Sequence, residues 1–96
     1  MSKDVLEELA EIIKKRKRSL PNDSYVAKLF KKGKVKIANK FGEEAVETIS
    51  AFLYQEKKEL LEEASDLIFH LMILLEHSNL NLSEVKKILK DRMKND

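Results

Sequence analysis

The 96-residue chain is short and strongly charged, with 43% apolar residues, 38% charged residues, two Gly, one Pro and a net charge of only +2. This balance favours a single all-α domain over residues 1–96, so small that a partner chain or a bound ion is expected to support its core. The absence of Cys excludes disulfides and thiolate metal sites and fits a cytoplasmic protein.

Export and membrane insertion are not expected. The N-terminus mixes charged and apolar residues and lacks the apolar core of a signal peptide. The longest apolar run, residues 67–75, contains His70 and is too short for a bilayer, which needs roughly 20 residues.

The first helix is expected to begin at a Ser2 cap and to end near Arg18. Apolar residues recur in it at helical spacing, namely Val5, Leu6, Leu9, Ile12 and Ile13. Five Lys and Arg at residues 14–18 follow, and the helix dipole favours cations at that end. We interpret this run as a solvated helix end, with contact to phosphate or nucleic acid as the alternative.

After a turn at residues 20–23, a short helix is expected over residues 24–32. Asp23 or Ser24 is its expected cap, and Gly33 is expected to end it.

The third helix is expected to run from residue 34 through residue 52, with Gly42 inside it at a cost of about 1 kcal/mol relative to Ala. Gly42 either lets a backbone or ligand approach closely or is merely tolerated. A polar link around residues 55–59 leads to a fourth helix, expected over residues 57–78.

The second half of the fourth helix, LIFHLMILLEH, is apolar nearly all round. A helix in a small monomeric bundle keeps one polar face, so this pattern predicts a homodimer; an unusually enclosed helix in a monomer is the alternative. Asn81 and Glu84 have the spacing of a variant capping box for the last helix. The expected fold is bundle-like, with four main helices and one short helix, completed by dimerisation.

The third and fourth helices each carry two carboxylates three residues apart. Such pairs point in one direction, so antiparallel helices would bring all four together. Apolar residues are expected to crowd this region, including Val46, Ile49 and Phe52. Partly desolvated carboxylates repel one another, and an all-oxygen set suits Mg²⁺ or Mn²⁺. The four expected ligands are Glu44, Glu47, Glu63 and Asp66.

Charge is unevenly distributed along the chain. Residues 1–42 hold 12 Lys and Arg against 5 Asp and Glu, whereas residues 43–96 hold 7 against 12. This is the distribution that a site for a polyanion and its metal needs, although chance on a solvated surface gives it equally well. We interpret His70, four residues after Asp66, as a packed or hydrogen-bonding histidine rather than a metal ligand.

Two stretches, KFGEEAVE at residues 40–47 and EASDLIFH at residues 63–70, resemble the signature of the phosphoribosyl-ATP pyrophosphohydrolase family. This family is the histidine-biosynthesis member of the all-α nucleoside triphosphate pyrophosphohydrolase (MazG-like) superfamily. The run SYVAKL at residues 24–29, followed by Gly33, is similar too, and the resemblance extends to about residue 92. The length looks like the free-standing form rather than the fusion with the cyclohydrolase of the next step.

The departures from the family pattern are small. Ser65 stands where Ala is usual, Phe69 where Tyr is common and Phe41 where Val is typical. These differences concern fine substrate contacts and remove no carboxylate.

The resemblance implies Mg²⁺-dependent hydrolysis of phosphoribosyl-ATP to phosphoribosyl-AMP and pyrophosphate, with Mn²⁺ as a substitute. Glu43 is the candidate catalytic base or a second metal contact. Lys28 and Lys40 would hold phosphates, and Ser24 and Tyr25 would lie near the ribose-phosphate end. One alternative is a MazG-like house-cleaning enzyme for non-standard nucleoside triphosphates. Another is a non-enzymatic helical module that binds nucleic acid or protein through the basic first part, although neither nucleic acid nor a membrane is the expected partner.

Overall fold

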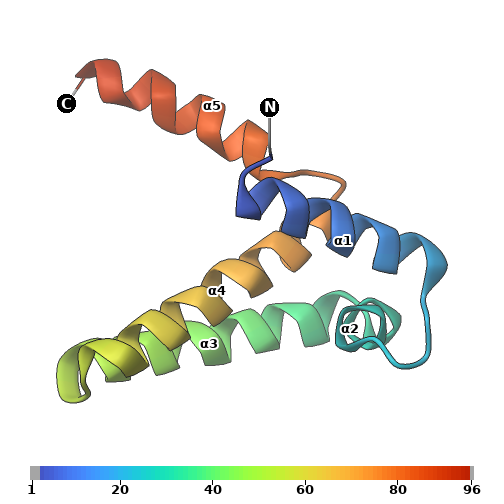
Figure 1. The fold of residues 1–96 in the computed structure, drawn as a ribbon, viewed down its shortest axis with the longest axis horizontal. Helices are drawn as coiled ribbons and strands as arrows, with labels where there is room; N and C mark the ends of the chain where they lie inside the picture. Colours follow the sequence, from blue (N-terminus) through green and yellow to red (C-terminus); the bar gives the residue numbers. More distant parts are fainter. Residues whose placement is uncertain (1–2, 96) are drawn as a thin grey trace.

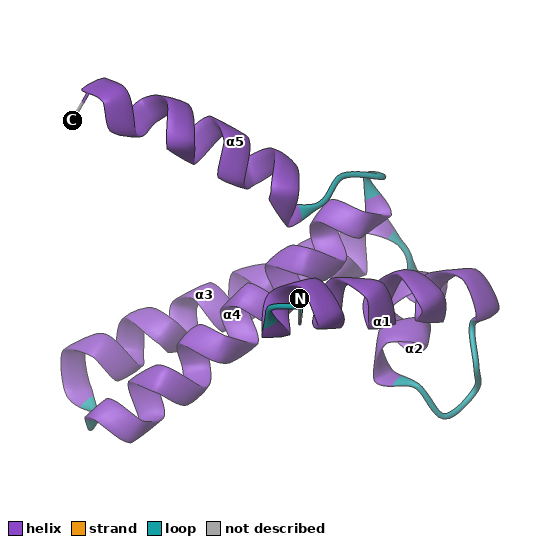
Figure 2. Cartoon of the chain, turned by 45° about the horizontal axis from the view of Figure 1, so that its top comes forward, coloured by secondary structure: helices purple, strands orange, loops and turns teal. Residues whose placement is uncertain are grey.

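The structure is a computed structural model that describes residues 3–95, and the elements in this range are all helical. The expected all-α class is therefore confirmed (Figure 2). The helices are α1 (Val5–Ser19), α2 (Tyr25–Lys32), α3 (Lys34–Tyr54), α4 (Lys57–His77) and α5 (Leu82–Arg92), followed by a short 3-10 turn η1 (Met93–Asn95).

Figure 1 shows how these helices are arranged: α3 and α4 form a long antiparallel hairpin, α1 and α2 lie at one end of it, and α5 points away. The contact between α3 and α4 is the most extensive one between any two helices of the described chain. The short link of Gln55 and Glu56 produces this hairpin, because it leaves the two helices no room to separate. It is shorter than the link expected at residues 55–59.

Local capping explains where α1 and α2 begin. Ser2, the expected first cap, lies outside the described residues, and the cap of α1 is Asp4, whose Oδ1 accepts from the Leu6 backbone N–H at 3.3 Å. Of the two candidates for α2, Ser24 is the cap: its Oγ accepts from the Ala27 N–H at 3.1 Å.

Gly33 alone connects α2 to α3. Its φ of 94° and ψ of −176° lie in a region that only glycine adopts readily. Its N–H donates to the Leu29 carbonyl at 3.2 Å and its carbonyl accepts from the Ile37 N–H at 3.1 Å. One residue therefore ends one helix and begins the next.

The capping box expected for α5 is confirmed. The Asn81 backbone N–H donates to Glu84 Oε2 at 3.0 Å, and Asn81 Oδ1 accepts from the Ser83 N–H at 3.0 Å. Despite this well-formed start, α5 contains no buried residue. The cap and the link to α4 therefore determine where α5 begins, and little packing against the other helices supports it.

The hydrophobic core lies where α1 and α2 meet the hairpin. Ile13 and Ile73 are almost completely buried in it. The whole buried cluster consists of Ile13, Val26, Leu29, Ile37, Met72 and Ile73. Lys17 fastens α1 to the end of α4, because its Nζ donates to the Glu76 carbonyl at 2.6 Å and to Asn79 Oδ1 at 2.8 Å.

Away from this core, the hairpin exposes apolar side chains. We expected Val46, Ile49 and Phe52 to crowd the carboxylates, but 62%, 58% and 72% of these side chains are exposed, so that expectation is wrong. The reason is helical geometry. Glu44 and Ala51 lie on the side of α3 that faces α4. Successive residues of a helix are rotated by about 100° about its axis, so Val46, Ile49 and Phe52 lie on other sides of α3 and point outward. No described helix has the length and apolarity needed to span a bilayer.

Candidate active site

Carboxylates from α3 and α4 converge midway along the hairpin. Single oxygens of Glu44, Glu63 and Asp66 lie within 4.8 Å of one another, and these residues are respectively buried, half-buried and exposed. The structure thus brings together three of the four carboxylates that the sequence spacing predicted to converge. Glu47 is exposed and lies outside this group of three, although it is near enough to Glu44 and Glu63 to raise the pKa of both carboxyls.

Thr48 holds the two helices together at this point. Its Oγ1 lies 2.8 Å from the Glu44 carbonyl oxygen, one turn earlier on α3, and 3.1 Å from the Glu63 carbonyl oxygen on α4. The hydroxyl can therefore share its proton between the backbones that carry two of the clustered carboxylates. Sequence reasoning missed this residue, because a threonine inside a helix ordinarily bonds only its own preceding turn.

The clustered carboxylates are held in an unfavourable electrostatic environment. Glu44 is only 6% exposed. Burial raises the pKa of the Glu44 carboxyl, and its hydrogen bond with Glu47 raises this pKa further. The pKa of Glu63 is also raised, first by its hydrogen bond with Glu47 and then by burial and the neighbouring negative charges. The cluster thus resists full ionisation by itself.

A divalent cation fits this donor set. Oε2 of Glu44 and Oε2 of Glu63 are buried and have no hydrogen-bond partner within residues 3–95. Buried acceptors are normally paired, and a cation beside the third carboxylate would satisfy these two unpaired oxygens. Oxygen-only sites of this kind suit hard cations such as Mg²⁺. Glu59 Oε1, one turn before Glu63 on the same face of α4, is buried and unpaired as well.

Lys40 supplies the nearest protein cation. Its Nζ lies 3.7 Å from Glu44 Oε1 and 3.7 Å from Glu43 Oε2, which places it between the buried carboxylate and an exposed one. Glu43 is 60% exposed at its side chain and stands outside the group of three. It is therefore free to face solvent or a ligand at the edge of the cluster.

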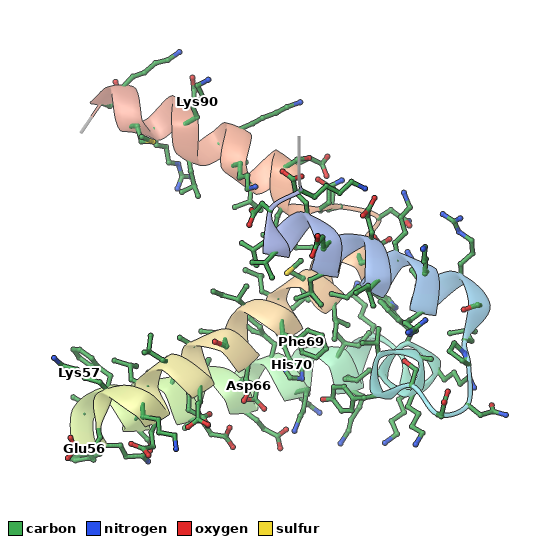
Figure 3. The ribbon with its side chains drawn as sticks, viewed as in Figure 1. Glu56, Lys57, Asp66, Phe69, His70 and Lys90 are labelled. Atoms are coloured by element: carbon green, nitrogen blue, oxygen red, sulfur yellow. The ribbon has the colours of Figure 1, made fainter. Side chains whose placement is uncertain are left out.

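His70 is buried and hydrogen-bonded, as expected from its place on α4. Its Nδ1 lies 2.6 Å from the Asp66 backbone carbonyl, which can only accept, so Nδ1 carries the proton. In the neutral ring Nε2 is then an acceptor, and Tyr25 donates to it through its hydroxyl at 2.7 Å. Figure 3 shows Asp66 and His70 on α4, one turn apart.

This pair of hydrogen bonds links the start of α2 to the carboxylate cluster. The Tyr25 ring also stacks on Phe69, with ring centroids 6.2 Å apart. Burial raises the pKa of the Tyr25 hydroxyl, which therefore remains a hydrogen-bond donor near neutral pH. The sequence gives no sign of the Tyr25–His70 contact, which joins residues 45 positions apart.

Most of the remaining expected site residues share one cavity. Tyr25, Lys28, Lys40 and Glu43 all line one cavity of about 300 Å³ between α2 and α3. Ser24 is not among its lining residues, and its Oγ is occupied as the cap of α2. The structure therefore brings four of these five residues to a common surface next to the carboxylates.

Known proteins resemble this chain over most of its length. The sequence pattern of the family described as "Phosphoribosyl-ATP pyrophosphohydrolase" matches residues 6–93. The chain is 48% identical over 91 residues to the "Phosphoribosyl-ATP pyrophosphatase" of Metallosphaera sedula, covering 95% of this chain and 98% of that protein. It is 52% identical over 75 residues to the protein of the same name from Zymomonas mobilis, covering 78% and 70%.

A third relative is longer than this chain. The chain is 42% identical over 87 residues to the "Histidine biosynthesis bifunctional protein HisIE" of Thermotoga maritima. The matched region covers 91% of this chain and 44% of that protein. The similarity therefore extends over less than half of the bifunctional protein.

Proposed function

The chain belongs to the phosphoribosyl-ATP pyrophosphohydrolase family, and on this premise we propose that it hydrolyses phosphoribosyl-ATP to phosphoribosyl-AMP and pyrophosphate in histidine biosynthesis. The observation that carries the proposal is the convergence of Glu44, Glu63 and Asp66 around two buried, unpaired oxygens. We place this biosynthetic reaction in the cytoplasm.

We propose that the carboxylates hold Mg²⁺, which Mn²⁺ could replace. The ligands would be Glu44, Glu63 and Asp66, with Glu47 joining them from the adjacent turn of α3. Such an ion neutralises a triphosphate and lowers the pKa of water. Thr48 keeps the two ligand-bearing helices in register, so that the oxygens are positioned before an ion arrives.

In the proposed reaction, the oxygen of a water molecule bonds to phosphorus while the bond between the α- and β-phosphates breaks. Glu43 would accept the proton that the water loses, because it is exposed at the edge of the cluster. Lys28 and Lys40 would donate to phosphate oxygens, and Tyr25 would lie toward the ribose-phosphate end. Ser24, the cap of α2, would lie next to Tyr25 at that end, outside the lining of the cavity. The products are phosphoribosyl-AMP and pyrophosphate.

Two isosteric substitutions test this proposal. Glu44→Gln and Asp66→Asn remove one negative charge each, and we expect each to lower the turnover of phosphoribosyl-ATP at least tenfold with the helical circular dichroism retained. Glu62→Gln is the matched control, because Glu62 is an exposed neighbour of Glu63 outside the cluster. Near-normal turnover in both site variants would contradict the mechanism.

The substrate is tested by a comparison with free nucleoside triphosphates. A MazG-like house-cleaning enzyme would share the carboxylate site but would turn over non-standard nucleoside triphosphates faster than phosphoribosyl-ATP. We expect the opposite preference when both are measured side by side, as kcat/KM, on the same preparation.

We further propose that the chain acts as a homodimer. The group of exposed apolar side chains on the hairpin is too large for a small protein to leave in water without reason. These residues are Val46, Ile49, Phe52, Leu53, Tyr54 and Leu61. These residues lie near the tip of the hairpin. The sequence pattern had instead predicted a dimer contact at the second half of α4, where Met72 and Ile73 are buried within the chain itself.

A further inference from the structure

Two helices direct lysines into the cavity beside the carboxylate cluster. Lys28 and Lys32 lie one turn apart on α2, and Lys36 and Lys40 lie one turn apart on α3. The single residue Gly33 joins the two helices, which keeps their lysine-bearing faces together. The complete lining of this cavity of about 300 Å³ is Tyr25, Lys28, Leu29, Lys32, Lys36, Lys40 and Glu43.

The cavity has a large excess of positive charge. Glu43 is the one carboxylate among its lining residues, and it already pairs with Lys40. Within residues 3–95, Lys28, Lys32 and Lys36 have no carboxylate oxygen within 4.0 Å. Ammonium groups gathered in this way repel one another, and a bound anion relieves the repulsion.

Charge changes sign along one face of α3. Lys36 and Lys40 precede Glu44 on this face at intervals of one turn. The rise of a helix puts Lys36 about 12 Å from Glu44 along the axis, which is comparable with the length of a nucleotide. A ligand that lies along α3 therefore meets ammonium groups at one end and carboxylates at the other.

Phosphoribosyl-ATP carries two separate phosphate groups that suit these two environments. Its triphosphate can approach carboxylates only together with a divalent cation, whereas the monophosphate on its second ribose can be bound directly by ammonium groups. We propose that the lysine cavity binds this monophosphate, and that Lys32 and Lys36 determine specificity for phosphoribosyl-ATP over ATP. The inference rests on the proposed function and assigns a separate part of the substrate to a separate part of the site.

This assignment has a physical consequence for selectivity. ATP has the same triphosphate as phosphoribosyl-ATP but lacks the second phosphate. A site that held only the triphosphate would treat the two alike, and discrimination requires a contact that one substrate makes and the other cannot. The lysine cavity provides this contact outside the carboxylate cluster.

A cycle of two enzymes and two substrates tests the inference. The substrates are phosphoribosyl-ATP and the same molecule with the monophosphate removed, and the reaction is followed as pyrophosphate release. We expect removal of the phosphate to lower kcat/KM of the wild type at least tenfold. Lys36→Gln should lower kcat/KM about tenfold on phosphoribosyl-ATP, mainly through KM, and less than about twofold on the dephosphorylated substrate.

Lys32→Gln provides a second variant with the same expected pattern. Lys34→Gln is the control, because Lys34 lies on α3 two residues before Lys36, faces away from it and does not line the cavity. We expect this control to retain wild-type kcat/KM on both substrates. Circular dichroism of each variant verifies the fold. The substituted lysines are exposed, so we do not expect their replacement to disturb it.

Two results would overturn the inference while leaving the proposed function intact. An equal loss on both substrates would mean that the lysines hold the triphosphate, and no loss on either would mean that they are solvated surface groups. A wild-type enzyme that releases pyrophosphate from free nucleoside triphosphates but not from phosphoribosyl-ATP would instead overturn the proposed function, and this inference with it.

Discussion

The two ends of the α3–α4 hairpin are built very differently. At the end covered by α1 and α2, Ile13 and Ile73 are 1% and 0% exposed, whereas at the opposite end Phe52 and Tyr54 are 72% and 83% exposed. Both ends are equally helical and both contain large apolar residues. The difference is that the chain supplies a cover for one end only.

This comparison indicates where the stability of the chain originates. Apolar burial is the main favourable term in folding, and only the covered end provides it within one chain. The carboxylate cluster lies midway along the hairpin, between a buried end and an exposed end. A homodimer that covered the exposed end would therefore also stiffen one side of the site.

Matched truncations at the two ends have the largest expected effect. Ile73→Ala removes a fully buried side chain and should lower the free energy of unfolding by about 2–5 kcal/mol. Phe52→Ala removes an exposed one and should cost less than about 0.5 kcal/mol within a single chain. Urea denaturation under conditions that keep the protein monomeric measures both. Equal losses would show that the two ends do not differ in this way.

The oligomeric state sharpens the same comparison. We expect the wild type to sediment as a dimer and Phe52→Glu to sediment as a monomer, because a charge at the exposed end opposes its burial against a second copy. A matched Lys31→Glu change, at an exposed residue of α2, should leave the dimer intact. A wild-type monomer at all concentrations would contradict the proposed dimer.

The pH dependence of stability probes the region between the two ends. The pKa values of Glu44 and Glu63 are raised in the folded chain, so the folded chain binds these protons more tightly than the unfolded chain does. Their contribution to stability is complete below the unfolded pKa and is lost as pH rises through the folded pKa. We expect the metal-free protein to lose stability over this rise in pH.

Thermal unfolding with and without MgCl₂ checks the expectation. Excess MgCl₂ at neutral pH should raise the Tm of the wild type, because a bound cation replaces the missing protons. Glu44→Gln should be more stable than the wild type without metal and should respond less to MgCl₂. A wild type whose stability rises over the same pH range in EDTA would contradict the electrostatic account of the cluster.

The smallest expected effect is at the junction of α1 and α4. Lys17 Nζ donates to the Glu76 carbonyl, and also lies 3.2 Å from Glu76 Oε2. Lys17→Met keeps the length of the side chain but removes these bonds, and should lower the free energy of unfolding by about 1 kcal/mol. Lys15→Met, an exposed change on the same helix, should have no measurable effect in the same denaturation experiment.

Local signals in the sequence predicted the helices well. The Gly33 break, the Asn81–Glu84 capping box and the choice of Asp23 or Ser24 as a cap each depend on residues close together in the chain, which is why the sequence predicts them. The convergence of Glu44 with Glu63 and Asp66 was predictable for the same reason. Helical spacing fixed which way each pair points, and a short link made the helices antiparallel.

The features that were not predicted depend on distant contacts. The outward position of Val46 and Phe52 could not be inferred from their apolar character, which says that a residue favours burial but not which surface buries it. The Thr48 bridge between helices is likewise a matter of tertiary packing. Lys32 and Lys36 were open to prediction, since each is one turn from a lysine already assigned to phosphate.

The single-residue joint at Gly33 limits how the chain can vary in length. Inserting one residue there would rotate α3 by about 100° about its axis relative to α2 and would separate the two pairs of lysines. An insertion at the Gln55–Glu56 link would merely lengthen a solvent-exposed loop. We therefore expect natural and engineered variants to gain or lose residues at the hairpin tip and to keep the spacing across Gly33 constant.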